Sequence, residues 1–115
     1  MRSVLQGEVY WLRLPREGQG AAPHPYVVVQ DDVFNRSRVH SVVVCAISSN
    51  RKRFHEPGNV VLEIGEAGLE RPSAVIVSQI DAVDRERLGE RLGQLDPRRV
   101  RQVLAGLAFV QRLQR

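Results

Sequence analysis

The chain has 115 residues, of which 43% are hydrophobic and 26% are charged. These proportions are those of an ordinary globular protein and exclude an intrinsically disordered chain. The length is typical of one hydrophobic core, so we expect residues 1–115 to form a single domain. The only cysteine is Cys45, which excludes a disulfide framework and a cysteine-based zinc cluster.

The formal net charge is +4, from 17 basic and 13 acidic residues, and arginine provides 16 of the basic residues. Guanidinium groups bind phosphate bidentately, so this composition is compatible with a polyanionic partner, although a GC-rich genome would enrich arginine as well. The basic residues are unevenly distributed. Residues 35–58 contain five of them and one acid, and residues 97–115 contain five arginines and no acid. We therefore expect one basic face.

The apolar runs of the sequence are short. The longest lie at 26–29, 42–47 and 103–110, whereas a membrane-spanning helix needs ~20 apolar residues. Residues 1–7 contain no hydrophobic signal segment. We therefore expect a cytoplasmic protein without a membrane partner.

Alternating and β-branched residues predict several short strands. In residues 7–14, Tyr10, Leu12 and Leu14 alternate with Trp11 and Arg13, which is typical of a half-buried strand. The further segments expected to be strands or extended lie at 26–30, 39–48, 59–64, 73–80 and 89–95. The intervening polar segments predict loops or turns, and residues 84–88 predict one helical turn.

The last element is a helix. Asp96 followed by Pro97 is typical of an N-cap and a first helical position. Apolar residues then recur at helical spacing, at Val100, Val103, Leu104, Leu107 and Val110. Gly106 lowers the helical propensity slightly. The wide apolar band predicts packing on the sheet and leaves surface for a partner subunit.

Five or six short strands closed by one helix predict a mainly β fold, either a strongly bent antiparallel sheet or a partly open barrel. No metal or cofactor is expected. His24, His40 and His55 have no helical i, i+4 spacing and no cysteine partner, and no glycine-rich segment joins a strand to a helix.

Polar residues occur where predicted strands begin or end. His24 precedes one apolar strand, Ser48 and Ser49 follow another, and Gln79 lies near the end of a third. If these strands are neighbours, the side chains meet at one edge of the sheet below the basic segment 51–53. Taken singly, such residues are more often ordinary surface or strand-end residues than parts of a site, and their spacing alone does not identify one.

Several motifs occur in a particular order along the chain. Gly7-Glu8-Val9-Tyr10-Trp11 opens the first strand, His24-Pro25 precedes an apolar strand, and Ile47-Ser48 ends the next one. The others are Asn35-Arg36-Ser37 in a turn, Gln79-Ile80 at a strand end and Leu95-Asp96 before the last helix. Together they resemble the MazF/PemK family of toxin endoribonucleases from type II toxin–antitoxin modules.

The resemblance implies a small SH3-like barrel of the CcdB/PemK type and a homodimer. It also implies sequence-selective, metal-independent cleavage of single-stranded RNA by attack of the ribose 2′-hydroxyl on the adjacent phosphate, an mRNA interferase activity. Such a reaction needs a base, an acid and positive charge at the phosphorane. The implied partners are single-stranded RNA and a cognate antitoxin with an acidic tail.

By the same resemblance, the catalytic positions of the family map onto His24 and Ser48, and the role of Ser48 as acid, base or anchor stays open. The family has an arginine where this chain has His24. Either the histidine transfers protons while an arginine supplies the charge, or the site is weakened. The family's loop over the RNA groove has the pattern Gly-x-Glu-Gln-Gly-Gly, and residues 18–23 replace it with Gly-Gln-Gly-Ala-Ala-Pro, which lacks the glutamate–glutamine pair. The expected RNA-binding residues are Arg16, Gln19, Ser49, Arg51, Arg53 and Gln79.

Two alternatives remain. One is a toxin of the same fold that binds DNA gyrase, as CcdB-like proteins do. The sequence ends Gln111-Arg112-Leu113-Gln114-Arg115 and lacks the Trp-Gly-Ile tail of that group. The other is a catalytically silent member that binds only its antitoxin or RNA.

Overall fold

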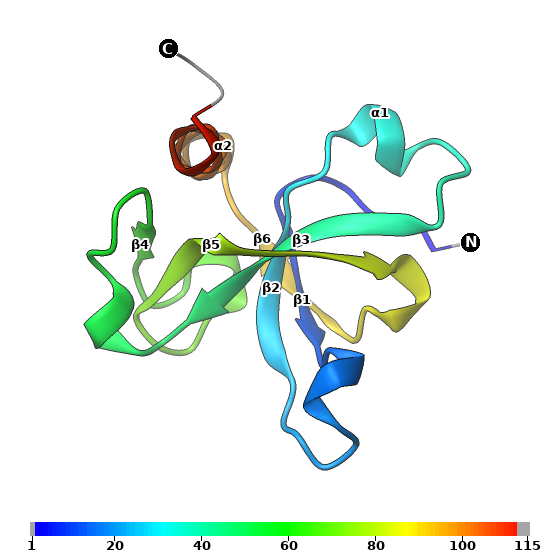
Figure 1. The fold of residues 1–115 in the computed structure, drawn as a ribbon, viewed down its shortest axis with the longest axis horizontal. Coiled ribbons are helices and arrows are strands. Elements are labelled where there is room, and N and C mark those ends of the chain that lie inside the picture. Colours follow the sequence, from blue (N-terminus) through cyan, green and yellow to red (C-terminus); the bar gives the residue numbers. More distant parts are fainter. Residues whose placement is uncertain (1, 113–115) are drawn as a thin grey trace.

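The computed structural model describes residues 2–112 and contains one strongly curled, six-stranded antiparallel sheet with a C-terminal helix (Figure 1). The strand order is β4-β5-β3-β2-β1-β6. The strands are β1 (Glu8–Leu12), β2 (His24–Val28), β3 (Ser41–Ser48), β4 (Val60–Leu62), β5 (Ser73–Asp84) and β6 (Arg91–Gln94). The helices are α1 (Asp32–Asn35) and α2 (Pro97–Gln111), and single 3-10 turns lie at η1 (Pro15–Glu17), η2 (Arg51–Arg53), η3 (Glu66–Gly68) and η4 (Arg85–Arg87). The mainly β prediction with a final helix is confirmed.

Both faces of the curled sheet are apolar. On β2 and β3, Val27 and Cys45 face one core cluster, and Tyr26 and Val44 face the other. Helix α2 covers the first cluster with its buried residues, Val103 and Leu107 among them. Successive side chains of a strand point to opposite faces of the sheet, so the curled sheet has one core cluster on each face.

Helix α2 begins as the sequence predicts. The Asp96 side chain accepts a hydrogen bond from the Arg99 amide, and Pro97 occupies the first turn. Among the described residues, no helix combines the length and the apolar character that a membrane crossing requires.

Some element bounds differ from the prediction. Strand β2 begins at His24, two residues before the predicted start, and β5 continues to Asp84, four residues past the predicted end. The polar segment 31–38 contains the short helix α1, whose N-cap Asp31 accepts a hydrogen bond from the Val33 amide. The helical turn predicted at 84–88 is the 3-10 turn η4. The added residues of β2 and β5 have a weak propensity for strands by themselves. They are extended because they pair with a neighbouring strand.

Strand β5 carries a bulge opposite β3. Cys45 pairs with Ile80, whereas Ile47 pairs with Val75, so β5 has extra residues between these points. The backbone groups freed there find side-chain partners. The Val77 amide donates to Asn59 Oδ1 at 3.0 Å, and the Cys45 thiol donates to the Ile76 carbonyl at 3.0 Å. The bulge bends β5, so that its first half pairs with the end of β3 and its second half with the beginning of β3.

Arg85 is an unexpected part of the core. Its side chain is buried, and its guanidinium donates to the backbone carbonyls of Arg2, Asn35 and Val39. Three carbonyl acceptors offset much of the cost of burying the charge. Arg85 therefore ties the N-terminal segment, α1 and the start of β3 together.

Candidate functional site

A groove of about 940 Å³ runs across the end of the sheet where β2 begins and β3 ends. Its polar lining comes from six separate segments and comprises Arg16, Glu17, His24, Ser48, Ser49, Asn50, Glu70, Arg71, Ser73 and Gln79. Its apolar lining includes Trp11, Leu14, Tyr26, Leu69 and Leu92. A concave surface with converging polar groups on an apolar floor is the usual form of a binding or catalytic site.

His24 and Ser48 both line this groove. Strands β2 and β3 are antiparallel, and the last pair of their register is Tyr26 opposite Ala46. His24 and Ser48 each lie two residues beyond this pair, one at the start of β2 and the other at the end of β3. The two strands thus bring an imidazole and a hydroxyl to the same edge of the sheet, at the groove.

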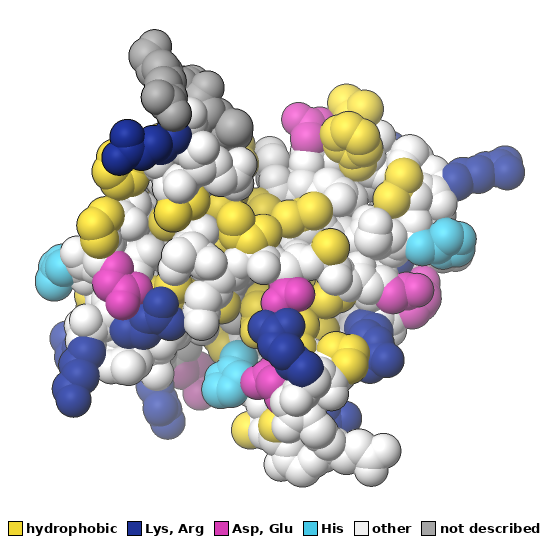
Figure 2. Space-filling view, viewed as in Figure 1, with side chains coloured by type: hydrophobic (Ala, Val, Ile, Leu, Met, Phe, Trp, Pro, Cys, Tyr) yellow, Lys and Arg dark blue, Asp and Glu magenta, His cyan; other side chains and the backbone are white. Residues whose placement is uncertain are grey.

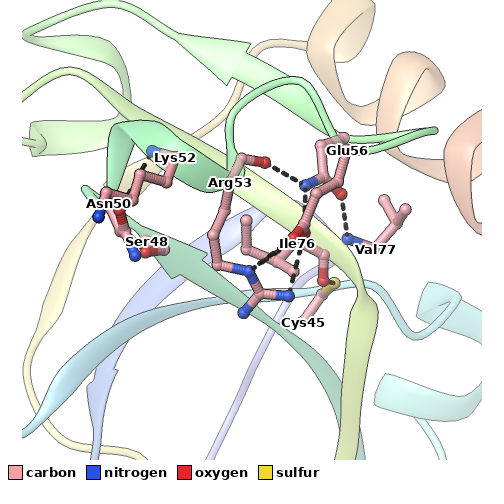
Figure 3. A network of polar contacts seen from close by, with 9 residues as sticks. Cys45, Ser48, Asn50, Lys52, Arg53, Glu56, Ile76 and Val77 are labelled. Carbon is pink, nitrogen blue, oxygen red and sulfur yellow. Dashed lines mark hydrogen bonds and ion pairs between the residues drawn. The ribbon is translucent and has the colours of Figure 1, made fainter.

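The Ser48 hydroxyl is oriented by the chain that follows it. Ser48 Oγ accepts a hydrogen bond from the Asn50 amide at 3.1 Å, and the Asn50 side chain accepts one from the Lys52 amide at 3.1 Å (Figure 3). Because Ser48 Oγ accepts here, its proton is free to be donated into the groove. The same two bonds start the basic turn η2 immediately beyond the groove.

Two arginines line the groove, and only one of them has a carboxylate partner among the described residues. Arg16 Nη2 lies 2.9 Å from Asp81 Oδ2, and this carboxylate raises the pKa of the Arg16 guanidinium. Arg71 enters from the segment before β5. Tyr26 lies between β1 and β3, and its burial, with the charges of Glu17 and Asp81, raises the pKa of its phenol. The phenol therefore stays neutral.

The groove contains five of the eight residues singled out by the sequence, namely Arg16, His24, Ser48, Ser49 and Gln79. Gln19, Arg51 and Arg53 do not line it. The Arg51 guanidinium lies 5.8 Å from the centre of the Phe54 ring, and Arg53 forms an ion pair of 3.0 Å with Glu56 (Figure 3). The basic turn η2 therefore lies beside the groove rather than above its centre.

No metal-binding cluster occurs in residues 2–112: nowhere in this range do three or more histidine, cysteine, aspartate or glutamate side chains gather as ligands. Cys45 is buried, which raises the pKa of its thiol to about 12, so it remains a neutral thiol hydrogen-bonded to Ile76.

Comparison with known families gives one match over nearly the whole chain. Residues 5–110 match the family described as PemK-like, MazF-like toxin of type II toxin–antitoxin system. The chain belongs to this toxin family.

Curated members of the toxin family are similar over most of their length. The chain is 33% identical to endoribonuclease MazF6 of Mycobacterium tuberculosis over 109 residues, which cover 93% of this chain and 96% of that protein. It is 32% identical to endoribonuclease EndoA of Bacillus subtilis over 96 residues, which cover 81% of each chain.

Solved structures of the toxin family share the fold. An endoribonuclease in complex with its cognate antitoxin, from a mycobacterial species, superposes with a TM-score of 0.81 at 22% identity, covering 97% of this chain and 98% of that one. A MazE–MazF complex from Deinococcus radiodurans superposes with a TM-score of 0.74 at 18% identity, covering 96% of this chain and 97% of that one. These likenesses confirm the predicted CcdB/PemK-type architecture.

Three groove residues of this toxin were missed by sequence reasoning. Trp11 is 38% exposed and offers an aromatic face in the groove, and Arg71 and Asn50 add polar groups. The sequence did contain an indication for Trp11. The alternation in the first strand predicts that Trp11 points outward with Arg13, and an exposed tryptophan is typical of binding surfaces. The sequence contained no such indication for Arg71, because only the folded chain brings residues 68–71 next to the end of β3.

Proposed function

We propose that this toxin is an endoribonuclease that cleaves single-stranded RNA at selected sequences without a metal ion. The observation that carries the proposal is that His24 and Ser48 line one groove together with two arginines. The curated relatives are named endoribonucleases, which supports the same activity here.

In the proposed reaction, the ribose 2′-hydroxyl attacks the adjacent phosphate and the 5′-oxygen leaves, giving a 2′,3′-cyclic phosphate and a 5′-hydroxyl. The imidazole of His24 moves a proton, because an imidazole can both accept and donate one. The Ser48 hydroxyl donates a hydrogen bond to a phosphoryl oxygen, and an arginine balances the charge that develops on the phosphorane. Trp11 offers a face on which a base can stack.

The test is to incubate the purified protein with a long single-stranded RNA in EDTA and to map the ends of the fragments. We expect discrete cuts with 5′-hydroxyl ends. Ser48→Ala is expected to lower the cleavage rate by about 100-fold or more, because it removes a hydrogen bond that forms to the developing charge. Ser41→Ala, an exposed serine at the opposite end of β3, is the matched control and should cleave normally.

Absence of cleavage at acidic, neutral and alkaline pH would contradict the proposal. The toxin would then act on a protein target such as DNA gyrase or bind only its antitoxin.

We also propose that a cognate antitoxin covers the groove with an acidic tail. Two solved structures of the fold are titled as complexes with an antitoxin or with MazE. In this chain, Arg51 and Lys52 are exposed on η2 beside the groove, and the chain has a net charge of +4. A flexible acidic segment would gain affinity and speed of association from these charges.

A homodimer is the proposed assembly. Helix α2 exposes large apolar side chains, with Phe109 64% and Val110 43% accessible. Figure 2 shows hydrophobic surface running from α2 across the sheet toward α1. An apolar patch of this kind on a small protein marks an interface.

Phe109→Asp is expected to convert the dimer to a monomer, because it places a charge in the apolar contact. Sedimentation should give twice the 13.0 kDa chain mass for the wild type and a single chain mass for the variant. Ile64→Asp, at 65% exposure outside α2, is the control. A wild type that sediments as a single chain would contradict the dimer.

A further inference from the structure

The positive charge needed at the phosphate has few possible sources in this groove. Arg51 and Arg53 are occupied on η2 and lie outside the lining. Arg16 and Arg71 remain, and they approach from different segments of the chain. Of these two, only Arg16 is held by a second side chain of the described residues.

The backbone of Arg16 is fixed by the short turn η1. The Leu14 amide donates to Glu17 Oε1 at 2.9 Å, and the Glu17 amide donates to the Leu14 carbonyl at 3.0 Å. Pro15 occupies the first position of the turn, and the Arg13 guanidinium donates to the Gln19 carbonyl at 2.9 Å. These bonds give the proline- and glycine-rich segment a defined shape at the edge of the groove.

Asp81 fixes the other end of the Arg16 side chain. Asp81 lies opposite Val44 in the paired strands β3 and β5, beyond the bulge of β5. It engages Nη2 of Arg16, so Nε and Nη1 keep their N–H groups free for a phosphate. The Asp81 side chain is 29% exposed and that of Arg16 is 68% exposed.

Stability does not account for this pair. An ion pair as exposed as this one contributes little to stability, because water screens the charges. A carboxylate beside a groove that binds a polyanion also repels the substrate. Orientation of Arg16 offsets this cost, because a guanidinium held in place loses less conformational entropy when a phosphate binds.

We propose that Asp81 is a positioning residue, which holds the Arg16 guanidinium at the groove so that Arg16 supplies the positive charge that a histidine at position 24 does not. This inference rests on the proposed RNA cleavage and deepens it. His24 then transfers the proton, Arg16 supplies the positive charge, and Asp81 orients the Arg16 guanidinium.

The test compares kcat and KM on an RNA oligonucleotide that contains a mapped cleavage site. Asp81→Asn is expected to lower kcat about tenfold without raising KM, because Arg16 is still present but no longer oriented. Asp81→Glu should recover most of the lost kcat. In the Arg16→Ala background, Asp81→Asn should cause no further loss of kcat.

Glu70→Gln is the matched control for charge. Glu70 lines the same groove and has no ion-pair or hydrogen-bond partner among the described residues, so the variant removes one negative charge and no orientation. Its main effect should be a lower KM, because one negative charge fewer in the groove strengthens the binding of RNA. If Asp81→Asn behaves in the same way as Glu70→Gln, Asp81 acts only through its charge and the inference is wrong. Wild-type kcat in Arg16→Ala would overturn it as well.

Failure of the proposed function can be told apart from failure of this inference. If the wild type does not cleave RNA, the same variants are compared by their affinity for a 2′-deoxy oligonucleotide. Glu70→Gln should then bind more tightly than the wild type, whereas Asp81→Asn should show no such gain. In the Arg16→Ala background the two substitutions should have equal effects. If Asp81→Asn and Glu70→Gln raise the affinity for the oligonucleotide equally while Arg16 is present, Asp81 has no positioning role.

Discussion

Replacing His24 with alanine is expected to lower RNA cleavage by about 10²- to 10⁴-fold, the contribution that a positioned acid or base makes to catalysis. The side chain is exposed at the start of β2, so the fold should remain intact. The measurement is the initial rate of cleavage at a mapped site, together with the thermal unfolding temperature of each variant. His40→Ala changes an exposed histidine outside the groove and should cleave normally.

The pH dependence separates proton transfer from simple binding. Proton transfer by His24 makes the rate of cleavage by the wild type depend on pH, because only one charge state of an imidazole can act as base and only the other as acid. His24→Arg restores the residue type of the family motif, which stays charged throughout. We expect it to retain part of the activity and to lose this pH dependence. Undiminished cleavage by His24→Ala would show that the imidazole has no part in the reaction.

Replacing Gly106 with alanine is expected to destabilise the protein by about 2 kcal/mol, although alanine is the better helix former. A Cβ at position 106 would overlap the carbonyl oxygen of Gly58 and lie 3.0 Å from Val77 Cγ1. Overpacking of this kind costs about 1–3 kcal/mol, whereas helical propensity favours alanine by ~1 kcal/mol. The clash therefore outweighs the propensity, because backbone cannot move aside as a flexible side chain can.

Denaturant unfolding measures this difference. Gly20→Ala is the control, because a Cβ there meets no atom within 4 Å. It should leave stability unchanged or raise it slightly by restricting the unfolded chain. A Gly106→Ala variant more stable than the wild type would mean that α2 is not held against the segment at Gly58.

The elements that were predicted correctly are those whose signal is local. The N-cap at Asp96 and the proline at position 97 define the start of α2 through bonds within four residues. The β-branched run in β3 favours a strand through its own residues. By contrast, the second half of β5 is polar, and only pairing with β3 extends it to Asp84. From the sequence, Gly106 only lowers the helical propensity of α2. In the structure, the missing side chain lets α2 pack closely against the backbone at Gly58.

The candidate site shows the same division. The sequence alone determined the residue types at the strand ends, His24 and Ser48 among them, and the order of motifs that identifies the toxin family. The tertiary structure alone decided that His24 and Ser48 line one groove, that Asp81 reaches Arg16 and that Arg51 and Arg53 lie aside. Motifs and caps act over a few residues of chain, so they can be read directly. Strand register, a bulge and a cross-sheet ion pair join residues far apart in sequence, so they exist only once the sheet has formed.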